Sequence, residues 1–287
     1  SLYVNNSGLV GFWNFEEGDG ITVYDLSGND NHGTITGATY NTDVPEQSCQ
    51  LTTINGCDSV AVLNLTITEP DTSFTQVTAC ESYEWNGIIY TESGTYEHLV
   101  IEADNNYSMS FGGNSNDFEN YVEIPSSPIF SLQSEFTFNA WVKVPEIHNS
   151  WWGTVIGAYN TNGWQLYVGG NSFNINGAIQ LERLGCNYIA GTTDLRDNEW
   201  HYITVVIENG VISVYIDGQL EVAVNDDSCL PTDGNNINSN GVFFGEANHN
   251  HGQVENFPGE IDEISIWHKT LSNQEIQQYM ICPPLGN

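Results

Sequence analysis

The chain has 287 residues, 39% of them hydrophobic, which is enough to bury a large core. It carries only four Lys and Arg residues against 37 Asp and Glu residues, a formal net charge of −33. Such a surface repels phosphate backbones and anionic lipid headgroups, so the charge argues against nucleic acid and membrane surfaces as partners. Carboxylates are hard oxygen ligands, so the same charge favours divalent cations, although adaptation to salty water would also produce it.

The N-terminal segment predicts two strands with a polar loop between them. Residues 9–15, LVGFWNF, alternate apolar with small or polar residues, as a half-buried strand does. Residues 25–33, DLSGNDNHG, are dense in turn residues and oxygen ligands and predict a loop. Residues 34–40 predict a second strand.

Residues 46–103 have a different character and are predicted to be an inserted, β-rich, cysteine-containing subdomain. Residues 1–45 and 104–287 then form the main domain. The insertion holds a Thr-rich alternating stretch, 60–67, and a hairpin pattern that turns at Asn86-Gly87. Its cysteine and aromatic motifs resemble a β-rich repeat that occurs in tandem in large secreted bacterial surface proteins.

From residue 107 onward the sequence predicts many short strands and one helix. The clearest signal is a three-stranded meander over 201–224, whose turns Asn209-Gly210 and Asp217-Gly218 are type I′ signatures. Ser272 and Glu275 form a capping box that opens a short helix ending near Met280. The other strand candidates are 107–111, 121–124, 136–144, 154–158, 163–168, 178–183, 241–246 and 260–267. This pattern predicts an all-β fold, a two-sheet antiparallel jelly-roll sandwich with a short C-terminal helix.

Six cysteines without CxxC spacing are typical of disulfides in an extracellular protein rather than of a zinc or redox site. The connectivity is open from sequence alone. The favoured pairing joins Cys186 to Cys229 and Cys57 to Cys80, and by elimination Cys49 to Cys282.

Several motifs follow one another along the chain, at 8–18 (GLVGFWNFEEG), 25–33, 107–113, 121–125 (YVEIP), 136–143, 200–203, 215–218 (YIDG) and 259–267 (GEIDEISIW). Together these stretches resemble a laminin-G-like jelly roll of the concanavalin A-like lectin/glucanase superfamily. They cover most of residues 8–45 and 105–282. The resemblance implies the sandwich fold, but this fold hosts lectins, adhesion modules, spacers and hydrolases.

The same resemblance implies a calcium ion that bridges the first loop and the last strand, carried here by Asp25 and Asp262. Asn29 and Asn31 add side-chain oxygens at close spacing, and Gly28 lets the loop wrap a cation. The alternative is that Asp25, Ser27 and Asn29 only satisfy the backbone of a turn, as such side chains often do.

Four further residues are candidates for ligand binding. Trp151 and Trp152 follow a loop and cannot both face one core if extended, so one of them is free to stack on a sugar ring or to cover a sheet edge. His249 and His251 lie in a polar loop before the last strand. That loop is expected to be solvated or to add to a ligand rim, because the spacing of the two histidines is unspecific for a metal.

The stretch Glu260-Ile-Asp262-Glu263 resembles the catalytic strand of a glycosidase, but the residue that should be the general acid is missing. The glucanases of the superfamily use a Glu-x-Asp-x-x-Glu type of strand, and counting from Glu260 puts Ile264 or Ser265 where the acid should be. Glycoside hydrolysis needs two carboxylates across the scissile bond.

The sequence therefore predicts a secreted or cell-surface, calcium-stabilised, non-catalytic carbohydrate-binding or adhesion module of a larger bacterial surface protein. Its expected partners are a polysaccharide or glycoprotein glycan and neighbouring domains of the same chain. A structural spacer in a repeat array and a glycan hydrolase are the alternatives.

Overall fold

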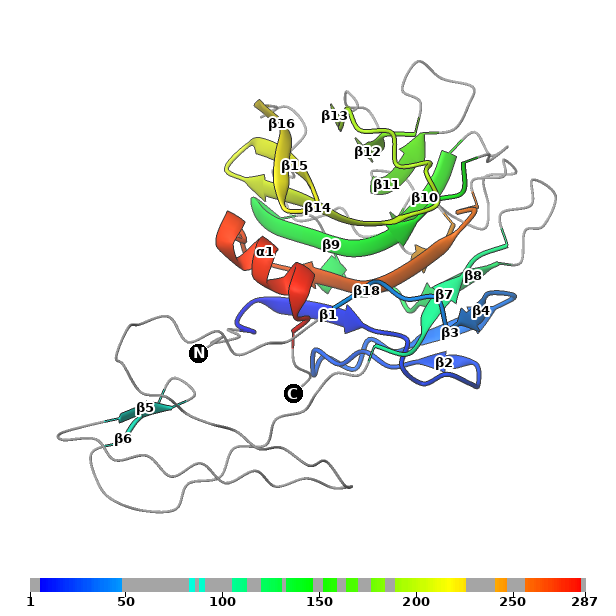
Figure 1. Cartoon of the computed structure of the whole chain (residues 1–287), viewed down its shortest axis with the longest axis horizontal. Helices are drawn as coiled ribbons and strands as arrows, with labels where there is room; N and C mark the ends of the chain where they lie inside the picture. The colour runs from blue at the N-terminus through cyan, green and yellow to red at the C-terminus, as the bar shows by residue number, and fades with distance from the viewer. Residues whose placement is uncertain are drawn as a thin grey trace, which may run out of the picture. The chain divides into compact units, whose positions relative to one another are not determined.

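Figure 1 shows a computed structural model of the chain. The structure describes residues 6–47, 83–85, 88–90, 105–112, 120–130, 133–146, 152–158, 164–169, 177–183, 189–225, 241–246 and 256–284. The chain divides into two compact units, Ser1–Asn5 with Cys49–Glu102 and Asn6–Ser48 with Ala103–Asn287. In the smaller unit, β5 (Tyr83–Trp85) pairs antiparallel with β6 (Ile88–Tyr90).

Two eight-stranded antiparallel sheets make up the larger unit (Figure 1). The first runs in the order β16 (Gln219–Asn225), β15 (Val211–Ile216), β14 (Trp200–Glu208), β9 (Glu135–Lys143), β18 (Glu260–Trp267), β7 (Ser108–Ser110) and β4 (Thr39–Asn41), and β1 (Leu9–Trp13) also pairs with β18. The second runs in the order β13 (Ile189–Ala190), β12 (Ile179–Arg183), β11 (Trp164–Gly169), β10 (Trp152–Ala158), β17 (Val242–Phe244), β8 (Tyr121–Ile124), β3 (Gly33–Thr36) and β2 (Thr22–Val23). A single turn of 3-10 helix, η1 (Pro128–Phe130), follows β8.

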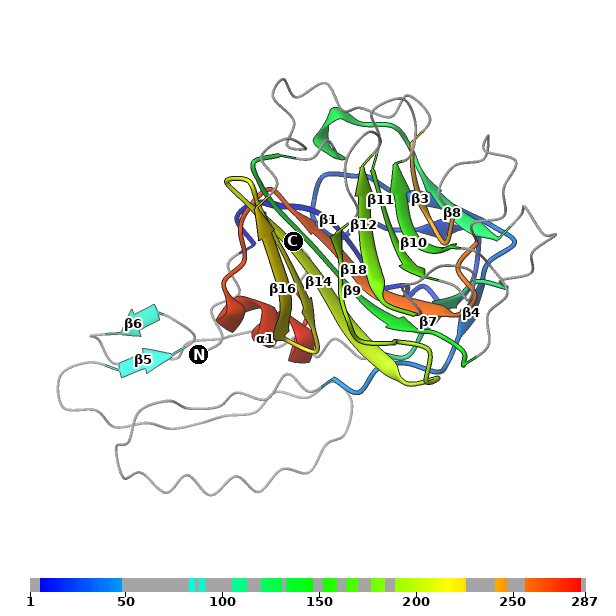
Figure 2. The same ribbon diagram turned by 90° about the horizontal axis from the view of Figure 1, so that it is seen from above.

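The core lies between the facing sheets (Figure 2), because alternate residues of each strand point inward. Ile203, Val205 and Ile207 of β14 are opposite Ile216, Val214 and Ile212 of β15, and all six are buried. Phe138 of β9 and Ile264 of β18 belong to the same apolar cluster as Phe244 and Leu166 of the second sheet. The predicted two-sheet sandwich is confirmed.

Turn chemistry explains why the meander is the part of the fold that the sequence predicts best. Asn209 and Gly210 have φ values of 47° and 91°, and Asp217 and Gly218 have values of 50° and 70°. Positive φ at both central residues is what a type I′ hairpin requires. The predicted helix is also present as α1 (Asn273–Ile281), and its capping box is formed by Ser272 and Glu275.

The segment 34–40 is not one strand, as the sequence predicts, but two strands in different sheets. β3 belongs to the second sheet and β4 to the first. Gly37, with a φ of 71°, turns the chain between them. Ile35 and Tyr40 both pack against the core but lie five residues apart, so the alternation changes phase across the turn. The pattern does not show which sheet each half joins.

At one end of β14, His201 is held between two carboxylates. Its Nδ1 lies 2.9 Å from Asp217 Oδ2 and its Nε2 3.1 Å from Asp197 Oδ2. The hydrogen bond with Asp217, helped by the one with Asp197, outweighs burial and raises the pKa of His201 to about 9. Imidazolium in this position ties β14 to the turn between β15 and β16.

We expect the His201 ion pairs to stabilise the fold only while the imidazole is charged. Because the pKa is raised above its usual value of 6.5, the contribution is complete below pH 6.5 and is lost as the pH rises through about 9. Since both carboxylates are half exposed, we expect about 1–2 kcal/mol. Urea unfolding of the wild type and His201→Gln at pH 6 and pH 10 checks this: the difference between the two proteins should shrink at pH 10, and an unchanged difference would contradict it.

Candidate functional site

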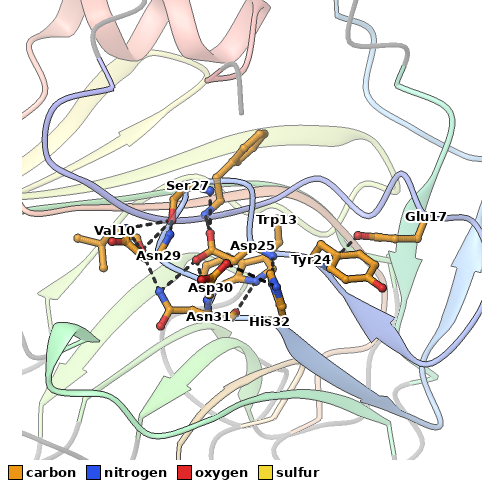
Figure 3. A network of polar contacts seen from close by, with 11 residues as sticks. Val10, Trp13, Glu17, Tyr24, Asp25, Ser27, Asn29, Asp30, Asn31 and His32 are labelled. Carbon is orange, nitrogen blue, oxygen red and sulfur yellow. Dashed lines mark hydrogen bonds and ion pairs between the residues drawn. The ribbon is translucent and has the colours of Figure 1, made fainter. Parts of the chain in front are cut away.

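The Asp25 carboxylate organises the loop that follows β2. Asp25 is buried, and its Oδ1 accepts hydrogen bonds from the backbone N–H of Phe12 at 3.0 Å and of Ser27 at 2.9 Å. Its Oδ2 accepts from the backbone N–H of Asn31 at 3.0 Å and from the side-chain Nδ2 of Asn31 at 3.1 Å (Figure 3). Each oxygen of the carboxylate therefore has two N–H donors.

The two asparagines of this loop bind β1 through their amide nitrogens. Asn29 Nδ2 donates to the carbonyls of Leu9 and Val10 at 3.2 and 3.1 Å, and Asn31 Nδ2 donates to Val10 at 3.2 Å. The Asn31 carbonyl accepts the indole N–H of Trp13 at 3.0 Å. These bonds fasten the loop to the irregular start of β1, where the register with β18 shifts between Leu9 and Gly11.

These contacts bear on the predicted metal site of Asp25, Gly28, Asn29, Asn31 and Asp262. In the described part of the chain, no polar contact joins Asp25 to Asp262. Gly28, with a φ of 86°, supplies the turn. The hydrogen bonds favour the alternative role for the loop, in which its side chains satisfy backbone groups. A metal role for Asp25 stays a prediction.

Asp262 and Glu263 lie where β18 changes neighbours. β18 pairs with β7 through Glu260 and Ile261, and with β1 from Ile264 onward. On its other side, the register with β9 shifts between Asp262 and Ser265, and Glu263 has a φ of 51°. This is a β-bulge, which places two carboxylates next to the point where β1 ends and β7 begins.

Both of these carboxylates are buried, with 0% of Asp262 and 4% of Glu263 exposed. Asp262 Oδ1 accepts the backbone N–H of Glu263 at 2.8 Å. Among the described residues, Asp262 Oδ2, Glu263 Oε2 and Asn105 Oδ1 have no hydrogen-bond partner. Burial raises the pKa of Asp262, although the Asn105 side chain acts to lower it. Burial also raises the pKa of Glu263, and the charge of Asp262 raises it further.

Glu16 links the two strand ends beside this acidic pair. It follows Phe15, whose φ of 56° turns the chain after β1. Its Oε1 accepts the backbone N–H groups of Asn106 at 2.7 Å and Tyr107 at 2.9 Å, just before β7. The negative charge of Glu16 also raises the pKa values of Asp262 and Glu263.

Acceptor oxygens without donors fit a hard cation, because calcium binds carboxylate and amide oxygens and completes its shell with carbonyls or water. Asp262, Glu263 and Asn105 supply this chemistry. No group of three or more His, Cys, Asp and Glu side chains is arranged as a metal site in the described ranges, so an ion here would depend on amide, carbonyl and water oxygens as well. Sequence reasoning found Asp262 but missed its partners Glu16, Asn105 and Glu263.

The structure describes only a small part of the other predicted site residues. Trp151, His249 and His251 lie outside the described residues, and Trp152 opens β10 with a side chain that is not described. Their ligand-binding role stays a prediction. Cys282 is buried and belongs to a disulfide whose other half lies outside the described residues. The pairings among Cys49, Cys57, Cys80, Cys186, Cys229 and Cys282 therefore stay predictions.

The architecture defines a class of protein, the two-sheet antiparallel jelly rolls. Within that class, residues 114–277 match the family model described as the concanavalin A-like lectin/glucanases superfamily. The chain belongs to this superfamily. Comparison with curated protein sequences finds no match. In the described part of the chain, no helix has the length and apolar character needed to span a membrane.

Three solved structures share the fold at low sequence identity. The binding domain of Paraclostridial Mosquitocidal Protein 1 is 12% identical, with a TM-score of 0.54 over 96% of this chain and 52% of that one. The receptor binding domain of botulinum neurotoxin C/D mosaic serotype is 15% identical, with a TM-score of 0.54 over 96% and 51%. Domain 4 of AbnA, a GH43 extracellular arabinanase from Geobacillus stearothermophilus in complex with arabinotriose, is 17% identical, with a TM-score of 0.54 over 95% and 98%. The chain thus spans about half the length of the toxin domains and nearly all of the arabinanase domain.

Proposed function

We propose that this chain is a non-catalytic, calcium-stabilised carbohydrate-binding module of a larger extracellular protein. The observation that carries the proposal is the buried acidic pair Asp262 and Glu263. Burial removes these carboxylates from any solvent-exposed substrate, and the acceptor oxygens without donors provide a place for a cation.

The non-catalytic part of the proposal follows from where the acids of β18 lie. Glycoside hydrolysis places two carboxylates on either side of a bound sugar, in contact with solvent or substrate. Glu260 is half-buried, and its Oε1 accepts hydrogen bonds from Asn41 Nδ2 at 3.2 Å and Ser110 Oγ at 3.5 Å. Asp262 and Glu263 are enclosed by protein. The strand therefore lacks an accessible pair of acids.

The calcium part of the proposal places the ion beside the β18 bulge, where β1 ends and β7 begins. Asp262, Glu263 and Asn105 would hold the ion, and Glu16 would contribute negative charge beside it. When bound, the ion would neutralise the buried carboxylates and fasten the end of β1 to the start of β7. Its role is structural, because it would lie beneath the surface.

The carbohydrate part draws on what similar folds bind. One structure of similar fold is of botulinum neurotoxin type C, whose cell entry is dependent upon interaction with two ganglioside molecules, and another, domain 4 of AbnA, is in complex with arabinotriose. The disulfide at Cys282 supports an extracellular setting, since such bonds persist in oxidising compartments.

Affinity gel electrophoresis tests the proposed function. The protein is run in calcium through gels that contain arabinan, xylan, mixed-linkage β-glucan or galactomannan, and it is titrated with sialyllactose in solution. We expect at least one of these probes to bind, and no release of reducing ends on long incubation. Release of reducing ends would favour a hydrolase, and failure to bind any probe would favour a structural spacer.

A further inference from the structure

The proposed cation site is buried, so a sugar would bind elsewhere on the molecule. The loop that Asp25 organises presents an exposed aromatic ring at the edge of the second sheet. Val23, the last residue of β2, is fully buried, whereas Tyr24, which follows the strand, is 49% exposed. Ile21, which precedes β2, is 69% exposed.

Several contacts fix the position of Tyr24. Its backbone N–H donates to Glu17 Oε1 at 2.8 Å. Its ring meets the His32 ring edge to face, with centroids 5.1 Å apart and planes at 74° (Figure 3). A ring held in place before binding loses little conformational entropy when a ligand stacks on it.

His32 adds a directed polar group beside the ring. Its Nδ1 accepts the backbone N–H of Asp25 at 3.0 Å, so in the neutral tautomer the proton is on Nε2. Nε2 lies 3.8 Å from Asp30 Oδ1, and the Asp30 side chain is 90% exposed. An exposed aromatic face flanked by an N–H donor and a carboxylate matches the apolar face and the hydroxyl groups of a sugar ring.

The charge around this surface selects among sugars. Glu17 accepts the backbone N–H of Tyr24, and Asp30 lies beside His32. Of the four basic residues in the chain, three are in ion pairs: Lys143 with Asp43, Arg196 with Asp194 and Lys269 with Glu275. The fourth, Arg183, lies on the far strand β12, and its side chain is not described. A sialic acid, a uronic acid or a sulfated sugar would therefore meet carboxylates here and no Lys or Arg side chain to pair with its charge.

We propose that Tyr24 and His32 form a stacking subsite for a neutral sugar of a polysaccharide, an inference that rests on the proposed function. Tyr24 supplies the apolar platform, and His32 and Asp30 bond to hydroxyl groups at its rim. The alternative role of the ring is to shield the edge of β2 from pairing with another strand.

The test compares Tyr24→Ala, Tyr24→Phe and the control Tyr215→Ala with the wild type. Tyr215 is a partly exposed tyrosine of β15 in the other sheet. For whichever neutral polysaccharide the wild type binds, we expect Tyr24→Ala to weaken binding about five- to ten-fold, and Tyr24→Phe and Tyr215→Ala to leave it nearly unchanged. Melting curves should show that all the variants are folded at the temperature of the binding measurement, since Tyr24 is 49% exposed and Tyr215 is only partly buried.

Two results would overturn this inference while leaving the proposed function intact: full binding of the neutral polysaccharide by Tyr24→Ala, or binding of sialyllactose in preference to it. If the wild type binds none of the probes, the proposed function fails and this subsite fails with it.

Discussion

Replacing Asp25 by Ala is expected to lower the free energy of unfolding by about 3–5 kcal/mol, to the same extent in calcium and in EDTA. The substitution removes a buried carboxylate that accepts four hydrogen bonds. The backbone N–H groups of Phe12, Ser27 and Asn31 lose this acceptor, and the Asn31 side-chain amide keeps only its bond to the Val10 carbonyl. Chemical unfolding in urea at pH 7, with either buffer, measures the loss.

The loop offers its own control. Asp30 has the same charge five residues further on, and its side chain is 90% exposed. Because Asp30 has a φ of 57°, which Asn also adopts readily, we expect Asp30→Asn to change stability by no more than about 0.5 kcal/mol. Asp25→Asn should fall between the two, because it keeps one acceptor oxygen but turns an amide N–H₂ toward a donor. If the cost of Asp25→Ala disappears in EDTA, the loop binds the ion, as its residue spacing indicates.

Local chemistry explains which parts of the fold the sequence predicts. Asn209-Gly210 and Asp217-Gly218 specify their turns by backbone preference alone, so the meander follows from neighbouring residues. Ser272 and Glu275 specify the start of the helix in the same way. The change of sheet at Gly37 depends instead on which strands β3 and β4 meet, and no local pattern carries that information.

The candidate cation site depends on tertiary geometry in a similar way. Glu16, Asn105 and Asp262 are far apart in the chain, and they come together only because β18 changes partners at the bulge of Glu263. The spacing of Asp25, Asn29 and Asn31 is compatible both with metal binding and with binding of N–H groups. The position of β1 decides between them, because its backbone groups bond to all three side chains.

Removing calcium is expected to reverse the effect of Asp262→Asn on stability. In calcium, an ion at about 100 times its dissociation constant should stabilise the wild type by roughly 2.7 kcal/mol, and the variant should lack most of this gain. In EDTA, the wild type keeps two buried carboxylates with acceptor oxygens that have no donor. Asp262→Asn removes one of these charges and keeps an oxygen for the N–H of Glu263, so the variant should then be about 1–3 kcal/mol more stable than the wild type.

Melting curves of the two proteins in millimolar calcium and in EDTA should therefore cross. Glu260→Gln is the matched control, since it makes the same change of charge on the same strand at a half-buried residue that has its own partners, Asn41 and Ser110. Its effect should be equal in both buffers. If Asp262→Asn stabilises the protein equally with and without calcium, the acidic pair is neutralised by protonation rather than by a bound cation. The bulge of β18 would then be a strained junction between β1 and β7 and no metal site, and the calcium part of the proposed function would fall.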